Sequence, residues 1–410
     1  MHRIVSKDLP RLLVFSHVIP ESRYAGSLLL LRLLQDYPAE KLLVIGRPPH
    51  PESKILRCRY ESLQDVPMAR LYRTRFWRWI RSVAAYGLGA EVSVRDAERL
   101  AQRFRPDAVL TVMQESQYYC AASRYCSRNK VPFIILVHDL VELFEPVYAW
   151  AAKRQWRRNA EVYRSAAARF CISPAMAERL RKDYGAEGTV LYPNRSDDLM
   201  ARPSAMSETL RTEGRLTIGY AGSLNYGYAD GIQALLPALK AAGATLRVYS
   251  PVAPEGLGKH LEYAGFSPVP THTWERVKEE CDVVLLPYAW PEHFRTLCET
   301  HFPSKLTEYL ALGMPVLISG PAYAAGVAWG LQHPSAALTV SDPSSEAMRV
   351  ACVCLHEDAR LRRSLALEAV RAGNEEFNPI RIRYEFLQKL RDAVAQASHA
   401  ASGCASLPCA

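Results

Sequence analysis

The 410-residue sequence has no long apolar run, which argues against a protein with membrane-spanning helices. Its longest apolar stretch, around Val131–Val137, has the length of a strand, whereas a helix that spans a bilayer needs about 20 apolar residues. Near the N-terminus, the apolar segment Leu12–Phe15 is too short for the core of a signal peptide. From these two absences we expect a cytoplasmic protein without membrane-spanning helices.

The ten cysteines include no Cys-x-x-Cys pair, and their spacing follows no metal-binding pattern. A zinc site is therefore not expected. The interpretation that fits scattered cysteines in a cytoplasmic protein is a set of reduced, mostly buried thiols.

Positive charge is unevenly distributed along the chain. Residues 1–195 contain 32 Lys and Arg against 19 Asp and Glu, and the remainder contains 19 against 23. A protein that wraps nucleic acid along its whole length is disfavoured by this asymmetry. A basic first half that faces an anionic partner fits better.

Short apolar runs alternate with stretches of helical period over almost the whole chain, which is typical of parallel α/β units. The runs are apolar on both faces, as strands are when helices cover both sides of a sheet. A helix is expected from Ser27 to about Gln35. Strands are expected at 11–17, 41–46, 108–113, 133–137, 169–172 and 189–191, and in a second set at 216–222, 245–249, 282–287, 315–319 and 337–340.

The strand pattern restarts after a polar stretch at 195–214, which we interpret as a linker. We therefore predict an α/β protein of two facing doubly wound, Rossmann-like domains, 1–195 and 196–378, with ligands in a cleft at the carboxyl ends of the strands. An amphipathic helix at 379–397 could return to the first domain. Residues 398–410 are small and polar, and we expect a flexible tail there.

The most informative stretch is Phe-Pro-Ser-Lys-Leu-Thr-Glu-Tyr-Leu-Ala-Leu-Gly-Met-Pro-Val-Leu-Ile-Ser at 302–319. Its Pro-Ser opening predicts a helix start that places Ser304 and Lys305 at a helix N-terminus, where a phosphate can bind. Glu308 follows one turn later and could accept hydrogen bonds from ribose hydroxyls. The plain alternative is an exposed Lys–Glu pair on a surface helix.

This stretch resembles the nucleotide-sugar-binding motif of GT-B glycosyltransferases, particularly the branch of retaining family 4 that reads "PSK-EYLA-GxPV". The resemblance implies that Glu308 holds the ribose of the donor. Family members have a second Glu eight positions earlier, where this sequence has Thr300, and we place no role on the neighbouring Glu299. The matching residues are Glu308, Gly313, Pro315 and Val316.

A second resemblance lies in Ile-Gly-Tyr-Ala-Gly-Ser-Leu-Asn at 218–225, which is similar to the loop that faces the donor diphosphate in this family. The resemblance implies donor contacts from Gly222, Ser223 and Asn225. Many family members carry an Arg after this Gly, and Ser223 replaces it here. We therefore expect Lys305 to meet the diphosphate charge.

In the first half, the loop that contains Gly26 resembles the family's Gly-rich loop, although a Gly before a helix is also an ordinary turn. His138 follows the expected strand 133–137, where family 4 enzymes often place a His beside the reacting sugar. The resemblance therefore implies a donor-phosphate contact at Gly26 and a donor-sugar and transition-state contact at His138. In all it extends over roughly residues 11–390.

The segment 70–81 contains five Arg and four aromatic residues and no acidic residue. A second basic cluster occupies 153–158 on an expected helix. Three interpretations remain open for the first: an anionic membrane surface, nucleic acid, or a solvated helix that packs Trp77 on the core. Between the two binding functions we favour membrane or acceptor contact over nucleic acid, with the solvated helix as the plain alternative, and the candidate residues are Arg73, Arg75, Trp77, Arg78 and Trp79.

Together these features predict a glycosyltransferase that moves a sugar from a nucleoside-diphosphate donor to a lipid-linked or surface-polysaccharide precursor at the cytoplasmic membrane face. The resemblance implies retention of configuration, with His138 and Lys305 as catalytic contacts. We expect neither metal nor cofactor, and the sequence has no Asp-x-Asp motif. The alternatives are a catalytically impaired GT-B scaffold at the membrane and a nucleotide-sugar 2-epimerase.

Overall fold

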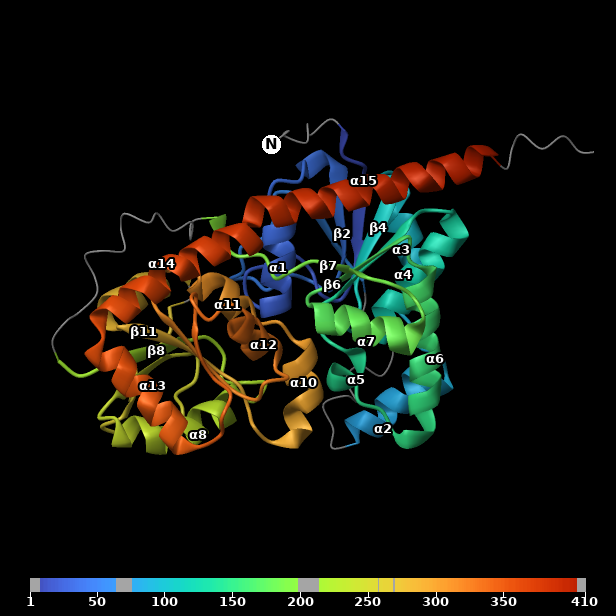
Figure 1. Cartoon of the computed structure of the whole chain (residues 1–410). Coiled ribbons are helices and arrows are strands. Elements are labelled where there is room, and N and C mark those ends of the chain that lie inside the picture. Colours follow the sequence, from blue (N-terminus) through green and yellow to red (C-terminus); the bar gives the residue numbers. More distant parts are fainter. Residues whose placement is uncertain (1–7, 64–75, 198–213, 257, 268–269, 404–410) are drawn as a thin grey trace, which may run out of the picture. The chain divides into compact units, whose positions relative to one another are not determined.

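The computed structural model describes residues 8–63, 76–197, 214–256, 258–267 and 270–403. The chain divides into two compact units, and each contains one parallel sheet (Figure 1). The first unit comprises Met1–Tyr192 with Arg381–Ala410, and the second comprises Pro193–Ile380. The expected linker falls mainly at 198–213, outside the described residues.

The sheet of the first unit has the order β3-β2-β1-β4-β5-β6-β7. All six strands expected in this half are present, and the four central ones are fully buried because helices cover both faces. Sequence reasoning missed β3, a polar edge strand without an apolar run. The strands are β1 Leu12–Phe15, β2 Leu42–Gly46, β3 Arg59–Ser62, β4 Ala108–Val112, β5 Phe133–Val137, β6 Ala168–Cys171 and β7 Thr189–Val190.

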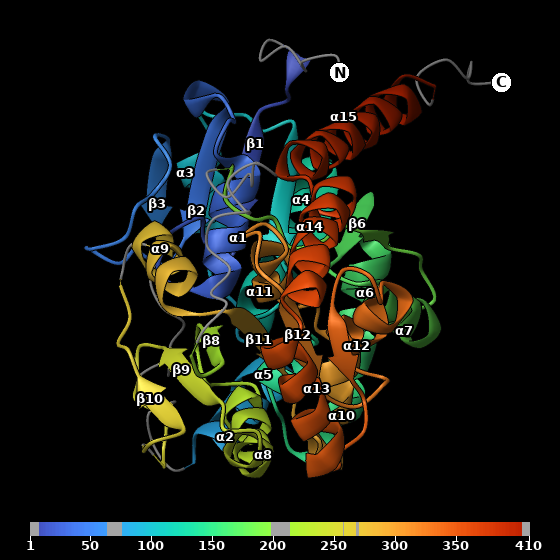
Figure 2. The ribbon, with the colours of Figure 1, turned by 60° about the vertical axis from the view of Figure 1, so that its left-hand side comes forward.

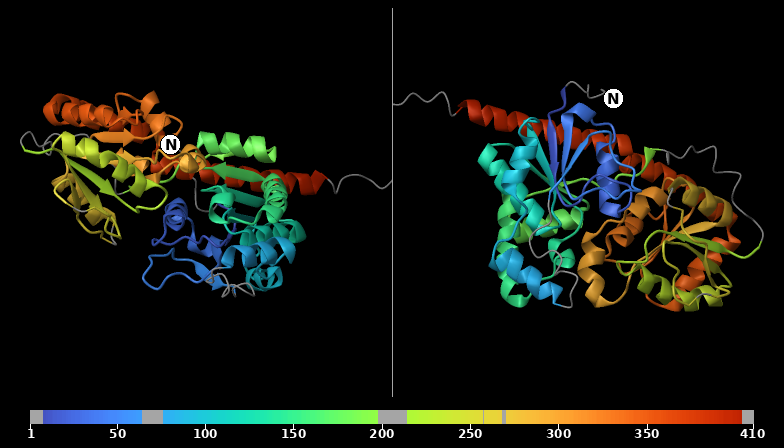
Figure 3. Two further views of the ribbon diagram at one scale, coloured as in Figure 1. Left: turned by 90° about the horizontal axis from the view of Figure 1, so that it is seen from below. Right: turned by 180° about the vertical axis from the view of Figure 1, so that it is seen from behind.

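Helices lie on both faces of this sheet (Figure 3), and one apolar core is formed on each face. Leu13 and Phe15 of β1 point to the core that includes α3, α4, α6 and α7. Leu12 and Val14 point to the opposite core, which α1 and α15 cover. The helices are α1 Ala25–Leu34, η2 Ala39–Lys41, α2 Trp77–Arg81, the π-helix η4 Ser82–Gly87, α3 Val94–Ala101, α4 Ser116–Asn129, α5 Val141–Phe144, α6 Ala149–Ser165 and α7 Pro174–Tyr184.

Helix α15, Pro379–Gly403, packs on the first unit although it follows the second in sequence. The ring of Phe386 lies 5.4 Å from that of Phe170 in β6, and Arg383 pairs with Asp36 at 3.1 Å. Burying a Phe side chain in this way stabilises a fold by about 1.5–3 kcal/mol. The helix continues to Gly403, so the beginning of the expected tail is helical.

The sheet of the second unit has the order β10-β9-β8-β11-β12-β13, again all parallel (Figure 2). The five expected strands are present, and the short edge strand β10 was missed. The strands are β8 Thr217–Ala221, β9 Thr245–Tyr249, β10 Leu261–Tyr263, β11 Val283–Pro287, β12 Val316–Ser319 and β13 Leu338–Val340. The helices are α8 Tyr228–Ala241, α9 Pro270–Glu280, η7 Glu292–Phe294, α10 Arg295–Thr300, α11 Ser304–Tyr309, α12 Ala325–Gln332, α13 Ser345–Glu357 and α14 Ala359–Glu376.

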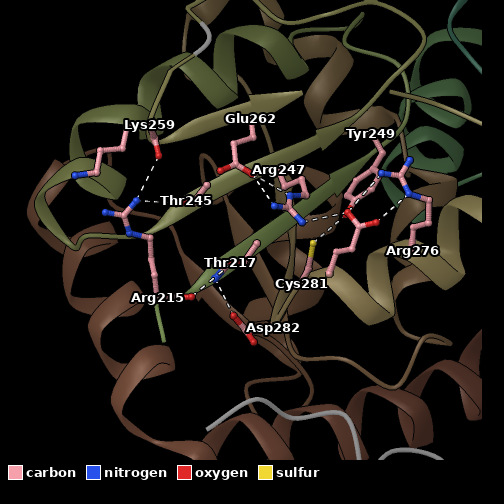
Figure 4. Close-up of polar contacts among 11 residues, drawn as sticks. Arg215, Thr217, Thr245, Arg247, Tyr249, Lys259, Glu262, Arg276, Cys281 and Asp282 are labelled. Atoms are coloured by element: carbon pink, nitrogen blue, oxygen red, sulfur yellow. Dashed lines mark hydrogen bonds and ion pairs between the residues drawn. The ribbon is translucent and has the colours of Figure 1, made fainter. Parts of the chain in front are cut away.

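A network of charged residues fixes α9 against β9 and β10 (Figure 4). The guanidinium of Arg247 donates to Glu262 at 2.7 Å and to Glu280 at 3.1 Å. Glu280 also accepts from the hydroxyl of Tyr249 at 2.9 Å and from Arg276 at 2.9 Å. Because Tyr249 ends β9, these contacts anchor the edge of the sheet at which the candidate donor loop begins.

Candidate functional site

Helix α11 and the loop after β8 are locked together at the carboxyl edge of the second sheet. The hydroxyl of Tyr309 accepts a hydrogen bond from the Ala221 amide at 3.0 Å and lies 3.3 Å from the Ala221 carbonyl, to which it can donate. Ala221 ends β8, and Gly222 follows it directly. Two segments that sequence analysis singled out separately therefore form one site.

Both the backbone conformation at residue 222 and the lack of space for a side chain there require a glycine. Its φ of +133° lies in a region that favours glycine. A Cβ added there would overlap Cε of Lys305 and lie 3.1 Å from its Nζ. The amide of Gly222 donates to the Tyr249 carbonyl at 2.8 Å. The loop backbone consequently approaches the Lys305 side chain as closely as a residue without a side chain allows.

The ammonium of Lys305 lies against aromatic rings. It is 3.9 Å from the centroid of the Tyr228 ring and 5.7 Å from that of Tyr220, both within the range of cation–π attraction. Burial lowers the pKa of Lys305 to about 8, and the nearby Glu308 opposes this shift. Among the described residues no carboxylate lies within ion-pairing distance of the ammonium. A desolvated cation in this setting is suited to an anionic ligand.

The structure brings Ser304, Lys305 and Glu308 together on α11 as predicted. The helix ends at Tyr309, and turns lead to Gly313 with φ +72°. The hydroxyl of Thr307 donates to the Ser304 carbonyl at 2.8 Å, which satisfies a backbone group inside this short helix. Glu308 is buried.

The loop from Gly222 to Gly227 is tightly folded. The hydroxyl oxygen of Ser223 accepts from the Asn225 amide at 3.1 Å, and the Ser223 carbonyl accepts from the Tyr220 hydroxyl. Tyr226 and Gly227 have φ of +62° and +80°. A left-handed conformation is costly for a tyrosine, and such residues cluster at functional sites.

Sequence reasoning missed the aromatic residues of this site. Tyr220 and Tyr228 flank the loop and hold the Lys305 ammonium, and the exposed ring of Tyr226 stacks on His301 with centroids 6.1 Å apart. The available signal was a tyrosine at each end of the glycine-containing loop. Spacing alone does not distinguish these tyrosines from core residues.

Thr300 occupies the position of the second Glu, eight residues before Glu308, and it bonds within its own helix. Thr300 is buried, and its hydroxyl donates to the Thr296 carbonyl one turn earlier in α10, at 2.8 Å. This hydrogen bond is internal to the helix. A threonine hydroxyl carries no negative charge, so Thr300 cannot replace the charge of a carboxylate.

In the first unit, Gly26 and His138 meet at the carboxyl edge of the sheet. Gly26 lies in the first turn of α1, and His138 directly follows β5. A Cβ on Gly26 would be 3.2 Å from Nδ1 of His138, which is tighter than an ordinary contact. His138 is 7% exposed. The two residues that sequence analysis proposed for this unit are thus neighbours.

A buried carboxylate that sequence reasoning missed lies in the same unit. Glu145 accepts from the Ser116 hydroxyl at 2.7 Å and the Ser116 amide at 3.0 Å, so it caps the N-terminus of α4. Tyr86 donates to it at 3.4 Å. Burial, assisted by the negative charge of Glu115, raises the pKa of Glu145 to about 7.

The structure describes only part of the predicted basic and aromatic segment. Arg73 and Arg75 lie outside the described residues. Arg78 donates to the Val147 carbonyl, and Trp77 lies 5.8 Å from the Arg81 guanidinium. Trp79 is 52% exposed. Of the expected membrane residues on α2, Trp79 is thus the most available to a partner.

The described residues contain no group of three or more His, Cys, Asp or Glu side chains that could hold a metal ion. Their eight cysteines are free thiols, and six of them are buried, as expected. No helix in the described part of the chain is long and apolar enough to cross a membrane.

Comparison with known proteins relates both units to one fold. The family model for the glycosyl transferase 4-like domain matches residues 33–195. Sucrose-phosphate synthase from Thermosynechococcus elongatus has a TM-score of 0.67 and 15% identity over 94% of this chain and 99% of its own. Anabaena HepE, solved with UDP and glucose, has a TM-score of 0.64 and 15% identity over 93% and 99%.

WaaG, a glycosyltransferase involved in lipopolysaccharide biosynthesis, has a TM-score of 0.55 and 12% identity over 92% of this chain and 98% of its own. A sequence search of curated proteins finds no significant match. The solved structures share the arrangement of two parallel sheets with flanking helices.

Proposed function

We propose that this chain, which has the GT-B fold, is a family 4-like glycosyltransferase and that its second unit binds a nucleoside-diphosphate sugar around Lys305. The observation that carries the proposal is the partly buried ammonium of Lys305, which lies beside the Gly222 loop and against the Tyr228 ring. A cation already desolvated in the free protein stabilises the charge that builds on a leaving diphosphate.

The other donor contacts follow from the same arrangement. The hydroxyls of Ser304 and Ser223 and the side chain of Asn225 supply hydrogen-bond donors to phosphate oxygens. Glu308, one turn along α11 from Lys305, accepts from the ribose hydroxyls. Uridine is the first base to test, because HepE has been solved with UDP-glucose.

His138 is proposed as a contact to the transferred sugar in the transition state, with Gly26 allowing the α1 terminus to approach the donor. Retention of configuration is proposed from the resemblance to family 4, without a protein nucleophile. The scheme uses protein cations and amides in place of a metal. The acceptor is proposed to be a lipid-linked or polysaccharide precursor at the cytoplasmic membrane face, which suits the basic first half of the chain.

One observation favours a second candidate, a GT-B scaffold with impaired catalysis. The hydroxyl of Thr300 is engaged within α10, and Ser223 stands where many relatives have an Arg. A scaffold of this kind would bind nucleotide sugar and transfer nothing. Binding and turnover therefore have to be measured separately.

The test is thermal stability of the full chain with UDP, UDP-glucose and the corresponding guanosine and adenosine compounds. A ligand at a hundred times its Kd adds about 2.7 kcal/mol to the free energy of unfolding. We expect stabilisation by one nucleotide class, lost in Glu308→Ala and kept in the control Glu346→Ala, an exposed Glu of α13 paired with Arg349.

Released nucleotide, measured on the same samples, separates the two candidates. Release of nucleotide above the rate of Lys305→Met, with water taking the sugar in place of the acceptor, supports the transferase. Stabilisation without any such release supports the scaffold. A folded protein that no nucleotide stabilises would exclude both.

A further inference from the structure

Two basic and aromatic clusters that are 69 residues apart in sequence adjoin in the first unit. Arg78 of α2 donates to the Val147 carbonyl from Nε at 3.2 Å and from Nη2 at 2.8 Å. The amide of Tyr148 donates to the Ser82 hydroxyl at 3.0 Å. These bonds fasten α2 and η4 to the beginning of α6 (Figure 1).

Further contacts hold α6 against η4. Arg154 and Arg158 of α6 donate to the carbonyls of Tyr86 at 3.2 Å and Ala85 at 2.8 Å. A small apolar core beneath them contains Ala85, Tyr86, Val147 and Ala151. The arginines that join α6 to η4 donate hydrogen bonds to backbone carbonyls. The large aromatic side chains are therefore not needed to hold these helices together.

Those rings are exposed instead. Trp79 and Trp150 are 52% and 46% exposed, and Leu88 at the end of η4 is 72% exposed. Trp150 lies beside η4, since a Cβ on Gly87 would be 3.8 Å from its ring. We call these exposed side chains on α2, at the end of η4 and at the beginning of α6 the aromatic patch, and its members are Phe76, Trp79, Leu88, Tyr148 and Trp150. Exposed apolar clusters bordered by polar residues mark interaction sites.

Positive charge borders the aromatic patch. Residues 66–90 and 149–160 contain no Asp or Glu. Lys153, Arg154 and Arg157 are exposed on α6, the first two about one turn from Trp150 and Arg157 two turns away on the same helix face. The Arg154 guanidinium lies 5.9 Å from the Trp150 ring. Cations beside amphipathic rings match the headgroup layer of an anionic bilayer, where rings enter the interface and cations meet phosphates.

We propose that the aromatic patch, with Lys153, Arg154 and Arg157, docks the first unit on an anionic phospholipid surface. The inference rests on the proposed function in that it identifies the surface through which a membrane-bound acceptor would be approached. It adds α6, Tyr148 and Leu88 to the residues that the sequence indicated. Nucleic acid would need the same cations and would not require apolar insertion.

The test is co-sedimentation of the full chain with phosphatidylcholine vesicles, with and without phosphatidylglycerol. We expect binding that requires phosphatidylglycerol and decreases with salt. Lys153→Gln together with Arg157→Gln should weaken it roughly 25-fold, because each cation near the surface contributes about fivefold. Trp79→Ala together with Trp150→Ala should weaken it at least as strongly.

The matched control is Trp156→Ala. Trp156 is on the same helix and is 49% exposed, but it lies toward α7 with its ring 6.4 Å from Tyr184. Its removal should leave vesicle binding unchanged, and a loss equal to that of the double aromatic variant would overturn the assignment of the face. Circular dichroism checks that all variants are folded.

Three results would overturn the proposal: no binding of the folded wild type to anionic vesicles, equal binding to neutral vesicles, or binding to duplex DNA of the same charge density that survives in the aromatic variant. Stabilisation by nucleotide sugar is measured in parallel. Because that assay reports on the second unit, a failed membrane test with intact nucleotide binding leaves the proposed transferase standing.

Discussion

The ammonium of Lys305 lies 3.9 Å from the ring centroid of Tyr228, and Gly222 lies beside the same lysine side chain. These contacts bring the short helix α11 and the glycine-containing loop after β8 together in one electropositive site. It also makes the site sensitive to pH and to any side chain at Gly222.

Nucleotide affinity should decrease as the pH rises through about 8. The protonated form of Lys305 attracts the diphosphate, and burial lowers its pKa to about 8, so deprotonation removes the charge on the alkaline side. Titration calorimetry with UDP from pH 6.5 to 9.5 measures this. In Lys305→Arg, whose side chain stays charged, affinity should be nearly constant.

Lys305→Met should weaken UDP binding about tenfold to a hundredfold, the range of a lost hydrogen bond to a charged group. Lys240→Met on the exposed side of α8 is its control and should bind as the wild type does. Equal affinities for the two variants would show that Lys305 does not contact the diphosphate.

Gly222→Ala should lower both stability and nucleotide binding. At φ +133° an alanine is strained by about 1–3 kcal/mol, and its Cβ would displace Lys305. Gly243→Ala is the matched control, since Gly243 has φ +67° and no atom within 4 Å of an added Cβ. Chemical denaturation should show a cost in both variants, and calorimetry a loss of UDP affinity in Gly222→Ala alone.

His138→Ala should lower turnover with little change in nucleotide binding. Loss of one preorganised polar contact to a transition state costs about a hundredfold to a thousandfold in kcat. Steady-state release of nucleotide from the donor measures this, with His356→Ala on the exposed side of α13 as control. If turnover is unchanged while the protein stays folded, His138 has no part in the reaction.

The buried carboxyl of Glu145 should make the first unit less stable as the pH rises. Its folded pKa of about 7 exceeds the ordinary value of 4.5, so the stabilisation is complete below about pH 4.5 and is lost as the pH rises through 7. Relative to Glu145→Gln, which cannot ionise, the wild type should lose up to about 3 kcal/mol between pH 4.5 and 8. Urea denaturation at several pH values tests this, and parallel pH profiles for the two proteins would contradict it.

The strands that are buried on both faces and the helix start at Ser304 could be predicted from the sequence alone. Both are local signals: an apolar run of strand length is visible without its neighbours, and a Pro-Ser opening needs only its own residues. The edge strands β3 and β10 were missed because their short sequences, Arg-Tyr-Glu-Ser and Leu-Glu-Tyr, contain charged residues and no apolar run.

Which of these segments come into contact is visible only in the folded chain. Contacts between Lys305 and Tyr228, between Gly26 and His138, and between α2 and α6 join residues from about 70 to more than 110 positions apart. No periodicity specifies such a pairing, because it depends on strand order and on how helices pack over the sheet. In the same fold, the Thr300 hydroxyl bonds to a carbonyl of its own helix and the Trp150 ring is exposed. The local sequence pattern predicts neither outcome.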